Sequence, residues 1–221
     1  MDSDALLAAA LAITGGHDGS TQESEEVAAL RHRFRNQLQT MTSLVSLCSQ
    51  RVGAGEGRDV LVDLRARFEA INLQQSDELA GKALVAGDRL LGLVVERLSG
   101  LYDPDRRRKI RFASSPFFAS PRQAAALAQI MTEMMIDLFR SGFPSGSGAE
   151  ARISALTRTD GALHLSLSLA GSGPAFPPSA TVALGLSIAE SLVHALEGSF
   201  ERRAENGLTI EATLPPDPET R

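Results

Sequence analysis

Two stretches near the start of the chain have the apolar spacing of amphipathic helices. Residues 23–51 contain neither proline nor glycine, and an apolar residue recurs every three or four positions: Val27, Leu30, Phe34, Leu38, Met41, Val45 and Cys48. This spacing predicts one long helix with a single apolar face. Three glycines within residues 51–58 predict a tight reversal, and a second periodic run follows, with Leu61, Leu64, Phe68 and Ile71. The pattern therefore predicts an antiparallel helical hairpin, placed at residues 23–80.

The apolar stripe of each predicted helix is wider than one partner helix covers. A second copy of the hairpin would bury the remainder in a four-helix bundle. We therefore expect a homodimer, with a monomer as the alternative.

The chain after the hairpin alternates between helical and strand patterns. A helix is expected at 84–102, a strand at 109–113, a helix starting at Ser120-Pro121, two strands around a turn at 159–161, a helix at 182–196 and two last strands. This order predicts an α+β fold over residues 81–215, with one mixed sheet and helices on one face. Residues 1–22 are expected to be an N-terminal segment and linker, and 216–221 a tail.

The composition is that of an ordinary globular protein. Of 221 residues, 43% are hydrophobic and 22% are charged, which excludes disordered and fibrous classes. The net charge is -5 and the pI about 5.4, so the chain as a whole does not attract nucleic acid or anionic lipid. We expect neither as a partner.

Nothing in the sequence predicts secretion or membrane insertion. The apolar run at residues 5–13 follows two aspartates in place of basic residues and is too short to span a bilayer. It is either a short docking helix or a frayed end. A single cysteine, Cys48, forms no internal disulfide or cysteine-based metal site and fits a reducing compartment. We therefore expect a cytoplasmic protein with no metal site of its own.

His32 is the candidate for chemistry on the first helix. It lies two residues from Leu30 and from Phe34, a rotation of about 200° on a helix, so its ring points away from the apolar stripe. The residues around it form a basic patch on an acidic protein: Arg31, Arg33, Arg35, Asn36 and Gln39. The plain alternative is a solvated helix face with no function.

The segment from His32 to Gln39 resembles the phosphoacceptor helix of HWE and HisKA_2 type bacterial histidine kinases, whose motif begins His-Arg-x-x-Asn. The resemblance implies that His32 carries a phosphoryl group. A neutral imidazole can act as a nucleophile toward phosphorus. Arg33 and Arg35 would partly neutralise the phosphohistidine, and Asn36 would bind the phosphoryl oxygens or fix the ring tautomer.

The second half is similar to the ATP-binding domain of the same kinases, the GHKL or Bergerat fold. Residues 130–140 resemble its N box, 171–177 its first glycine box and 183–188 its second. The departures fall on ligand-binding positions. Asp137 and Thr132 replace asparagines, Gly171 replaces the aspartate that recognises adenine, and Ala175 replaces the second glycine of a box that retains Gly173. Arg140, Ser141 and Leu208 replace further family residues.

These departures predict a degenerate nucleotide site. Glu133 is retained, yet alone it cannot bind ATP, so by this resemblance we expect no cofactor and no ATP binding. Only about 20 residues precede the histidine helix, so no sensor domain is expected. The combination resembles dimeric histidine phosphotransferases of the ChpT and Spo0B types, which relay a phosphoryl group between the receiver domains of response regulators, with Mg²⁺ supplied by the receiver. Two alternatives remain: an active kinase with an altered nucleotide site, and a pseudokinase scaffold that binds a regulator without phosphotransfer.

Overall fold

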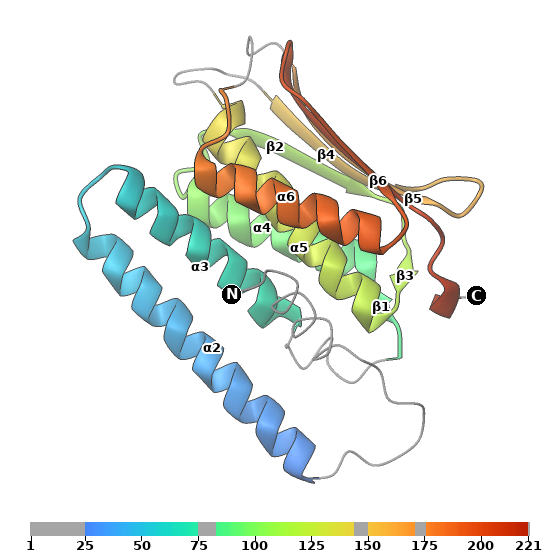
Figure 1. The fold of residues 1–221 in the computed structure, drawn as a ribbon, viewed down its shortest axis with the longest axis horizontal. Helices are drawn as coiled ribbons and strands as arrows, with labels where there is room; N and C mark the ends of the chain where they lie inside the picture. Colours follow the sequence, from blue (N-terminus) through green and yellow to red (C-terminus); the bar gives the residue numbers. More distant parts are fainter. Residues whose placement is uncertain (1–24, 75–82, 144–149, 171–175, 221) are drawn as a thin grey trace.

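The computed structural model describes residues 25–74, 83–143, 150–170 and 176–220, and it begins with a helical hairpin (Figure 1). Helix α2 spans Glu25–Arg51 and helix α3 spans Glu56–Gln74. In the loop between them Gly55 has φ +141°, a conformation that L side chains rarely adopt. The predicted hairpin with a glycine reversal is confirmed.

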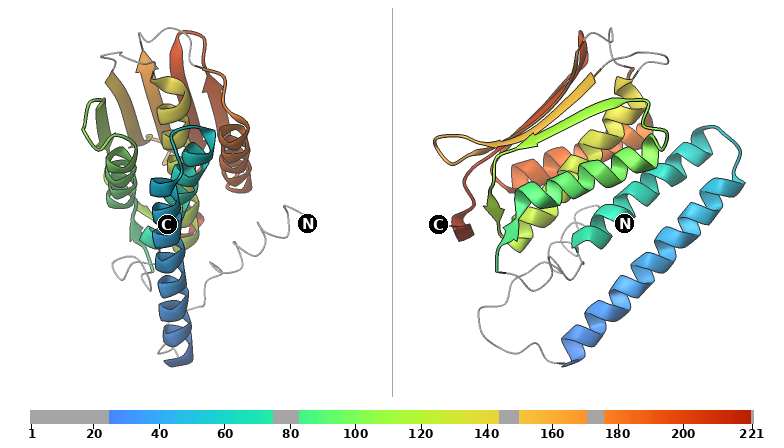
Figure 2. Two further views of the ribbon diagram at one scale, coloured as in Figure 1. Left: turned by 90° about the vertical axis from the view of Figure 1, so that its left-hand side faces the viewer. Right: turned by 180° about the vertical axis from the view of Figure 1, so that it is seen from behind.

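The rest of the chain is an α+β domain, as predicted. Its sheet has the order β2-β4-β5-β7-β6, in which β2 and β4 are parallel and the other neighbours antiparallel. The strands are β2 (Lys109–Ser114), β4 (Glu150–Thr157), β5 (Leu163–Ala170), β6 (Ser199–Arg203) and β7 (Gly207–Leu214). Three helices cover one face: α4 (Gly87–Tyr102), α5 (Pro121–Asp137) and α6 (Ala180–Ala195) (Figures 1 and 2).

Four short elements were not predicted. Strands β1 (Val85–Ala86) and β3 (Phe118–Ala119) pair beside the start of α5. A π-helical turn, η1 (Leu138–Gly142), continues α5, and a 3-10 turn, η2 (Pro218–Thr220), follows β7. In the segment expected to be a tail, the Asp217 carboxylate accepts a hydrogen bond of 2.7 Å from the backbone N–H of Ser120, the residue that caps α5.

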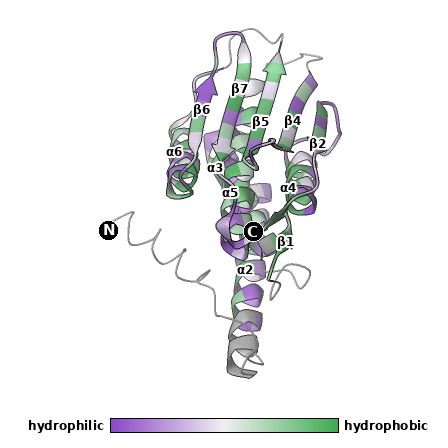
Figure 3. Cartoon of the chain, turned by 90° about the vertical axis from the view of Figure 1, so that its right-hand side faces the viewer, coloured by the Kyte–Doolittle hydropathy of each residue, from purple (hydrophilic) through white to green (hydrophobic). Residues whose placement is uncertain are grey.

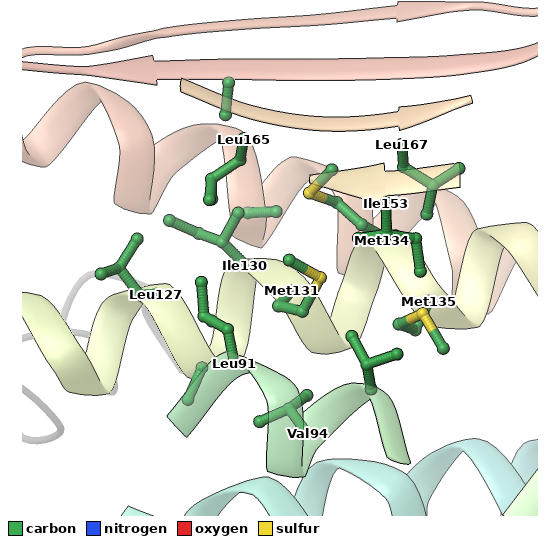
Figure 4. Close-up of a cluster of buried hydrophobic side chains, with 14 of the residues drawn as sticks. Leu91, Val94, Leu127, Ile130, Met131, Met134, Met135, Ile153, Leu165 and Leu167 are labelled. Atoms are coloured by element: carbon green, nitrogen blue, oxygen red, sulfur yellow. The ribbon is translucent and has the colours of Figure 1, made fainter. Parts of the chain in front are cut away.

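Helix α5 is the centre of the domain core. The Ser120 hydroxyl accepts a hydrogen bond from the Gln123 N–H and Pro121 occupies the first turn, which confirms the predicted helix start. Its methionines pack between the sheet and α4 (Figure 4), and the labelled core side chains are Leu91, Val94, Leu127, Ile130, Met131, Met134, Met135, Ile153, Leu165 and Leu167. Because other elements surround α5, even its polar residues Thr132, Glu133 and Asp137 are buried.

The hairpin adds two further layers. Helix α3 packs on α5 and α4, and α2 packs on the outer side of α3 (Figures 1 and 2). The buried residues of α3 include Asp63, Ala66, Ala70 and Leu73. Small side chains let α3 approach α5 closely.

The predicted apolar face of α2 is only partly correct. Leu38 is buried, but Met41 is 49% exposed and Cys48 is exposed. The face of α2 toward α3 also includes polar side chains. Asn72 donates to the Thr42 hydroxyl at 3.1 Å and Arg65 donates to the Ser46 hydroxyl at 3.2 Å. Figure 3 accordingly shows polar and apolar residues mixed along α2.

Within the described ranges, no helix has both the length and the apolar character that crossing a membrane requires.

Candidate functional site

His32 lies on a part of α2 that extends past the end of α3. Thr42 of α2 is opposite Asn72, and α3 ends at Gln74, whereas His32 is ten residues before Thr42. At about 1.5 Å per helical residue, His32 is roughly 12 Å beyond the last turn of α3. The His32 side chain is exposed. A globular partner can therefore approach the ring without displacing any of the hairpin residues that the structure describes.

Asn36 is the described side chain beside the imidazole. Its Nδ2 atom is 3.4 Å from Nδ1 of His32, one helical turn away. The two ends of an amide side chain can exchange places. With Oδ1 toward the ring, the amide oxygen accepts a hydrogen bond from Nδ1–H, which keeps the proton on Nδ1 and the lone pair on Nε2, the outer nitrogen. This geometry suits the tautomer role expected for Asn36.

The two basic residues of the proposed site differ in exposure. Arg33 is exposed and Arg35 is half-buried, and both take part in interactions with other groups. Glu133 and Asp137 of the N box lie in the domain core. Gly171 and Gly173 of the first glycine box are outside the described residues.

Glu133 is bound by an arginine from the hairpin. Arg67 of α3 donates from Nε to Oε1 and from Nη2 to Oε2, both at 2.7 Å. The Glu133 side chain is 1% exposed and that of Arg67 is 24% exposed. Parallel, charge-assisted bonds of this kind are among the stronger hydrogen bonds in proteins. Glu133 thus joins α5 to the hairpin.

Gly185 of α6, in the second glycine box, makes room for this pair. A Cβ atom at position 185 would collide with the Glu133 carboxylate and lie 2.6 Å from Nη2 of Arg67. We expect Gly185→Ala to lower the free energy of unfolding by about 1–3 kcal/mol, because the carboxylate must move out of its bidentate geometry. Urea unfolding of this variant and of Ala183→Gly, an exposed position on the same helix, measures the effect. Equal midpoints for Gly185→Ala and the wild type would contradict this.

Asp137 is bound by a second arginine. Arg202 of β6 donates from Nε to Oδ2 at 2.6 Å and from Nη2 to Oδ1 at 3.2 Å. The Asp137 side chain is fully buried. In the family pattern this position holds the asparagine that binds Mg²⁺, whereas here a guanidinium of the same chain supplies the positive charge.

Arg140, in the π-helical turn η1, forms further ion pairs between the N-box segment and α3. It bonds to Asp63 of α3 at 2.7 Å and to the Asp59 carboxylate at 2.6 Å. Tyr102 donates its hydroxyl to Asp63 Oδ1 at 2.6 Å. The buried Asp63 carboxylate therefore receives hydrogen bonds from both an arginine and a tyrosine.

The pKa shifts in this cluster follow from burial and from Asp63. Burial raises the pKa of Tyr102 far above its usual value, and the Asp63 charge and hydrogen bond add to the effect, so the phenol remains a donor. Burial acts to lower the pKa of Arg140, but the hydrogen bond and charge of Asp63 outweigh it and the pKa is raised. The Arg140 guanidinium therefore stays charged across the ordinary pH range.

The described residues do not fit a magnesium nucleotide. Both oxygens of Asp137 contact Arg202, and the Thr132 hydroxyl donates to the backbone carbonyl of Ala128. Leu208, where the family pattern has threonine, is fully buried in the hydrophobic core. A nucleotide phosphate or its Mg²⁺ would have to break the ion pair of Asp137 before it could bind there. Among the described residues, no three His, Cys, Asp or Glu side chains are grouped to hold a metal ion.

Sequence reasoning missed five residues of this region: Asp59, Asp63, Arg67, Tyr102 and Arg202. Asp63 and Arg67 are one helical turn apart, on the same side of α3 as the small residues Ala66 and Ala70. Charges on a face of small residues could have signalled a buried contact with another element. No local signal pairs Arg202 with Asp137, 65 residues earlier.

Comparison with known sequences places the hairpin in a family. Residues 30–82 match the HisKA_2 family, described as a histidine kinase family. The sensor histidine kinase PdtaS of Mycobacterium tuberculosis is 25% identical over 197 residues, which cover 86% of this chain and 39% of that protein. The chain thus spans about two fifths of the length of this curated relative.

Solved structures agree with the fold. The histidine kinase domain of the Erythrobacter litoralis EL346 blue-light activated histidine kinase has a TM-score of 0.61 and 17% identity, and the match covers 85% of this chain and 89% of that one. The structure described as the blue-light activated kinase itself gives a TM-score of 0.62 at 14% identity, over 89% of this chain and 62% of that one. Residues 30–82 thus match the HisKA_2 family, and the chain has the fold of a histidine kinase core, a helical hairpin followed by a domain like histidine kinase catalytic domains.

Proposed function

We propose that this protein is a histidine phosphotransferase that relays a phosphoryl group between receiver-domain aspartates through His32, without binding ATP. The observation that carries the proposal is the ion pair of Arg202 with Asp137, which occupies the position where the family pattern has a magnesium ligand. The exposed imidazole with Asn36 beside it supports the same function.

The transfer step requires only a few functional groups from this chain. The lone pair of Nε2 attacks the phosphorus of an aspartyl phosphate, the bond from phosphorus to the aspartate oxygen breaks, and the aspartate leaves as a carboxylate. Asn36 holds the proton on Nδ1, and Arg33 and Arg35 offset the charge of the phosphoryl group. The reverse step delivers the group to a second receiver. Each receiver domain supplies its own Mg²⁺ and acidic pocket, so transfer depends mainly on an exposed, oriented ring.

A homodimer is part of the proposal. On α2, the exposed apolar side chains Met41, Leu44 and Leu47 recur every three residues, and on α3 Val60 and Leu64 are partly exposed. A second hairpin would cover these side chains in a four-helix bundle. Size-exclusion chromatography with light scattering measures the mass directly, and we expect two chains per particle.

An autokinase is the second candidate, and the identity to a sensor histidine kinase favours it. A phosphotransferase should show no heat of binding when millimolar ATP and Mg²⁺ are titrated calorimetrically, because Asp137 is already paired. The Asp137→Asn variant, which restores the family residue, is the matched comparison. Micromolar affinity of the wild type, or label on His32 from radiolabelled ATP, would overturn the proposal in favour of a kinase.

The direct test is phosphotransfer without nucleotide. Receiver domains labelled with a small-molecule phosphodonor are mixed with the protein, and an acid-labile, alkali-stable label on the protein is the expected result. A panel of receivers measures partner preference. No transfer from any receiver, with dimer and fold intact, would support a scaffold instead.

A further inference from the structure

Three ion pairs tie the hairpin to the domain. All of them use charged residues of the N-box segment: Glu133 with Arg67, and Arg140 with Asp63 and Asp59. Four of these five side chains are at least three-quarters buried, the exception being Asp59. Charges in such positions interact strongly and are costly to separate.

The direction of α5 fixes where these contacts lie. Arg140, after the end of α5, contacts the first half of α3, and Glu133, in α5, contacts Arg67 further along. The two helices are therefore antiparallel, and the end of α5 that carries Asp137 is next to the hairpin loop (Figure 1).

His32 is at the opposite end of the hairpin. Arg67 is five residues closer to the loop than Asn72, which is opposite Thr42, and His32 is ten residues beyond Thr42 on the other side. At about 1.5 Å per residue, the contact of Arg67 with Glu133 therefore lies about 20 Å from His32 along the hairpin axis. The start of α5, with β1 and β3, points toward the His32 end.

We infer that Arg67 and Arg140 are positioning residues, which clamp the domain onto α3 so that hairpin and domain form one rigid surface for the receiver domain. The inference rests on the proposed function. Glu133 and Arg140, which lie in the segment that resembles a nucleotide-binding N box, here hold the domain against the hairpin. The domain then presents the same end to every receiver bound at His32, so no rearrangement is needed before docking.

The packing around the clamp resists domain movement. Ala66 and Ala70 are almost fully buried between α3 and the domain, so the helices are close. The carboxylate of Glu133 fills the space where a Cβ atom at position 185 would lie. A rotation of the domain about α3 has to break these ion pairs and expose Asp63 and Glu133 at once.

The test measures the distance between hairpin and domain in the full-length protein. Spin labels are placed at Gln39→Cys on α2 and Glu190→Cys on α6, both exposed, in a Cys48→Ser background diluted with unlabelled protein. We expect one narrow distance distribution. Arg67→Gln with Arg140→Gln should broaden it, and the exchange Arg67→Glu with Glu133→Arg should narrow it relative to Arg67→Glu alone. Arg203→Gln removes two ion pairs on the exposed side of the sheet, with Glu201 and Glu211, and is the matched control that should leave the distance distribution narrow.

The second readout is kinetic. Loss of the clamp should raise the KM for the receiver domain by about five- to tenfold and leave kcat within about twofold, because only docking is affected. An unchanged distance distribution in the folded double variant would overturn the clamp, and an unchanged KM would overturn its docking role. Should the double variant not fold, Arg140→Gln alone is measured in the same way. The distance measurement does not depend on phosphotransfer. If the wild-type protein relays no phosphate but its distance distribution still broadens when the clamp is removed, the proposed function is refuted and the clamp is not.

Discussion

Phosphotransfer is expected to fall by about 10³-fold or more, to the background rate, when His32 is replaced by alanine. The nucleophile is lost, and no described histidine is close enough to replace it, since His164 is on β5 and His194 on α6. Label transferred from a phosphorylated receiver, counted after gel separation, measures the loss.

The control for this variant is His194→Ala. His194 is also exposed and helical, but it lies in the last turn of α6 on the domain. Its removal should leave transfer at the wild-type rate. Wild-type transfer by His32→Ala, or a loss of similar size in His194→Ala, would refute the role of His32.

The largest effect on stability is expected from Asp137→Ala, which should lower the free energy of unfolding by about 3–5 kcal/mol. The change leaves the guanidinium of Arg202, whose side chain is 18% exposed, without its partner and opens space in the core. Urea denaturation followed by circular dichroism gives the change from the midpoint and slope.

Two further variants separate the ion pair from general packing. Asp137→Leu combined with Arg202→Met replaces both charges with apolar groups and should recover most of the loss. Glu201→Ala removes an exposed partner of Arg203 on the same strand and should have little effect. If Asp137→Ala unfolds at the same urea concentration as Glu201→Ala, the buried pair does not stabilise the domain.

The fold was largely predictable because its signals are local. The glycine loop, the Ser120-Pro121 start of α5 and the strand alternation each depend on neighbouring residues, and the structure has all of them. The π-helical turn was not predictable, since it depends on one shifted hydrogen bond from the Phe143 N–H to the Leu138 carbonyl. The face of α2 was partly wrong because the spacing of apolar residues cannot tell a helix partner from a dimer partner.

The chemistry of the degenerate site was predictable only in part. The sequence could show that Asp137 and Gly171 depart from a family pattern, since this requires only that the residues be aligned with the pattern. The partners of the two N-box carboxylates lie 65 or more positions away, Arg67 for Glu133 and Arg202 for Asp137. Such partners are fixed by sheet order and helix packing, which a single sequence does not encode locally.

The pair of Arg202 and Asp137 also restricts the order in which substitutions can accumulate. An aspartate at a fully buried position without a cation destabilises the fold, because its charge loses water and gains no partner. A lineage that starts from asparagine at position 137 therefore loses least stability if arginine is already present at position 202 when the aspartate arises. Once both are present, replacement of either residue alone leaves a largely buried charge unpaired, so a return to asparagine at position 137 is itself opposed.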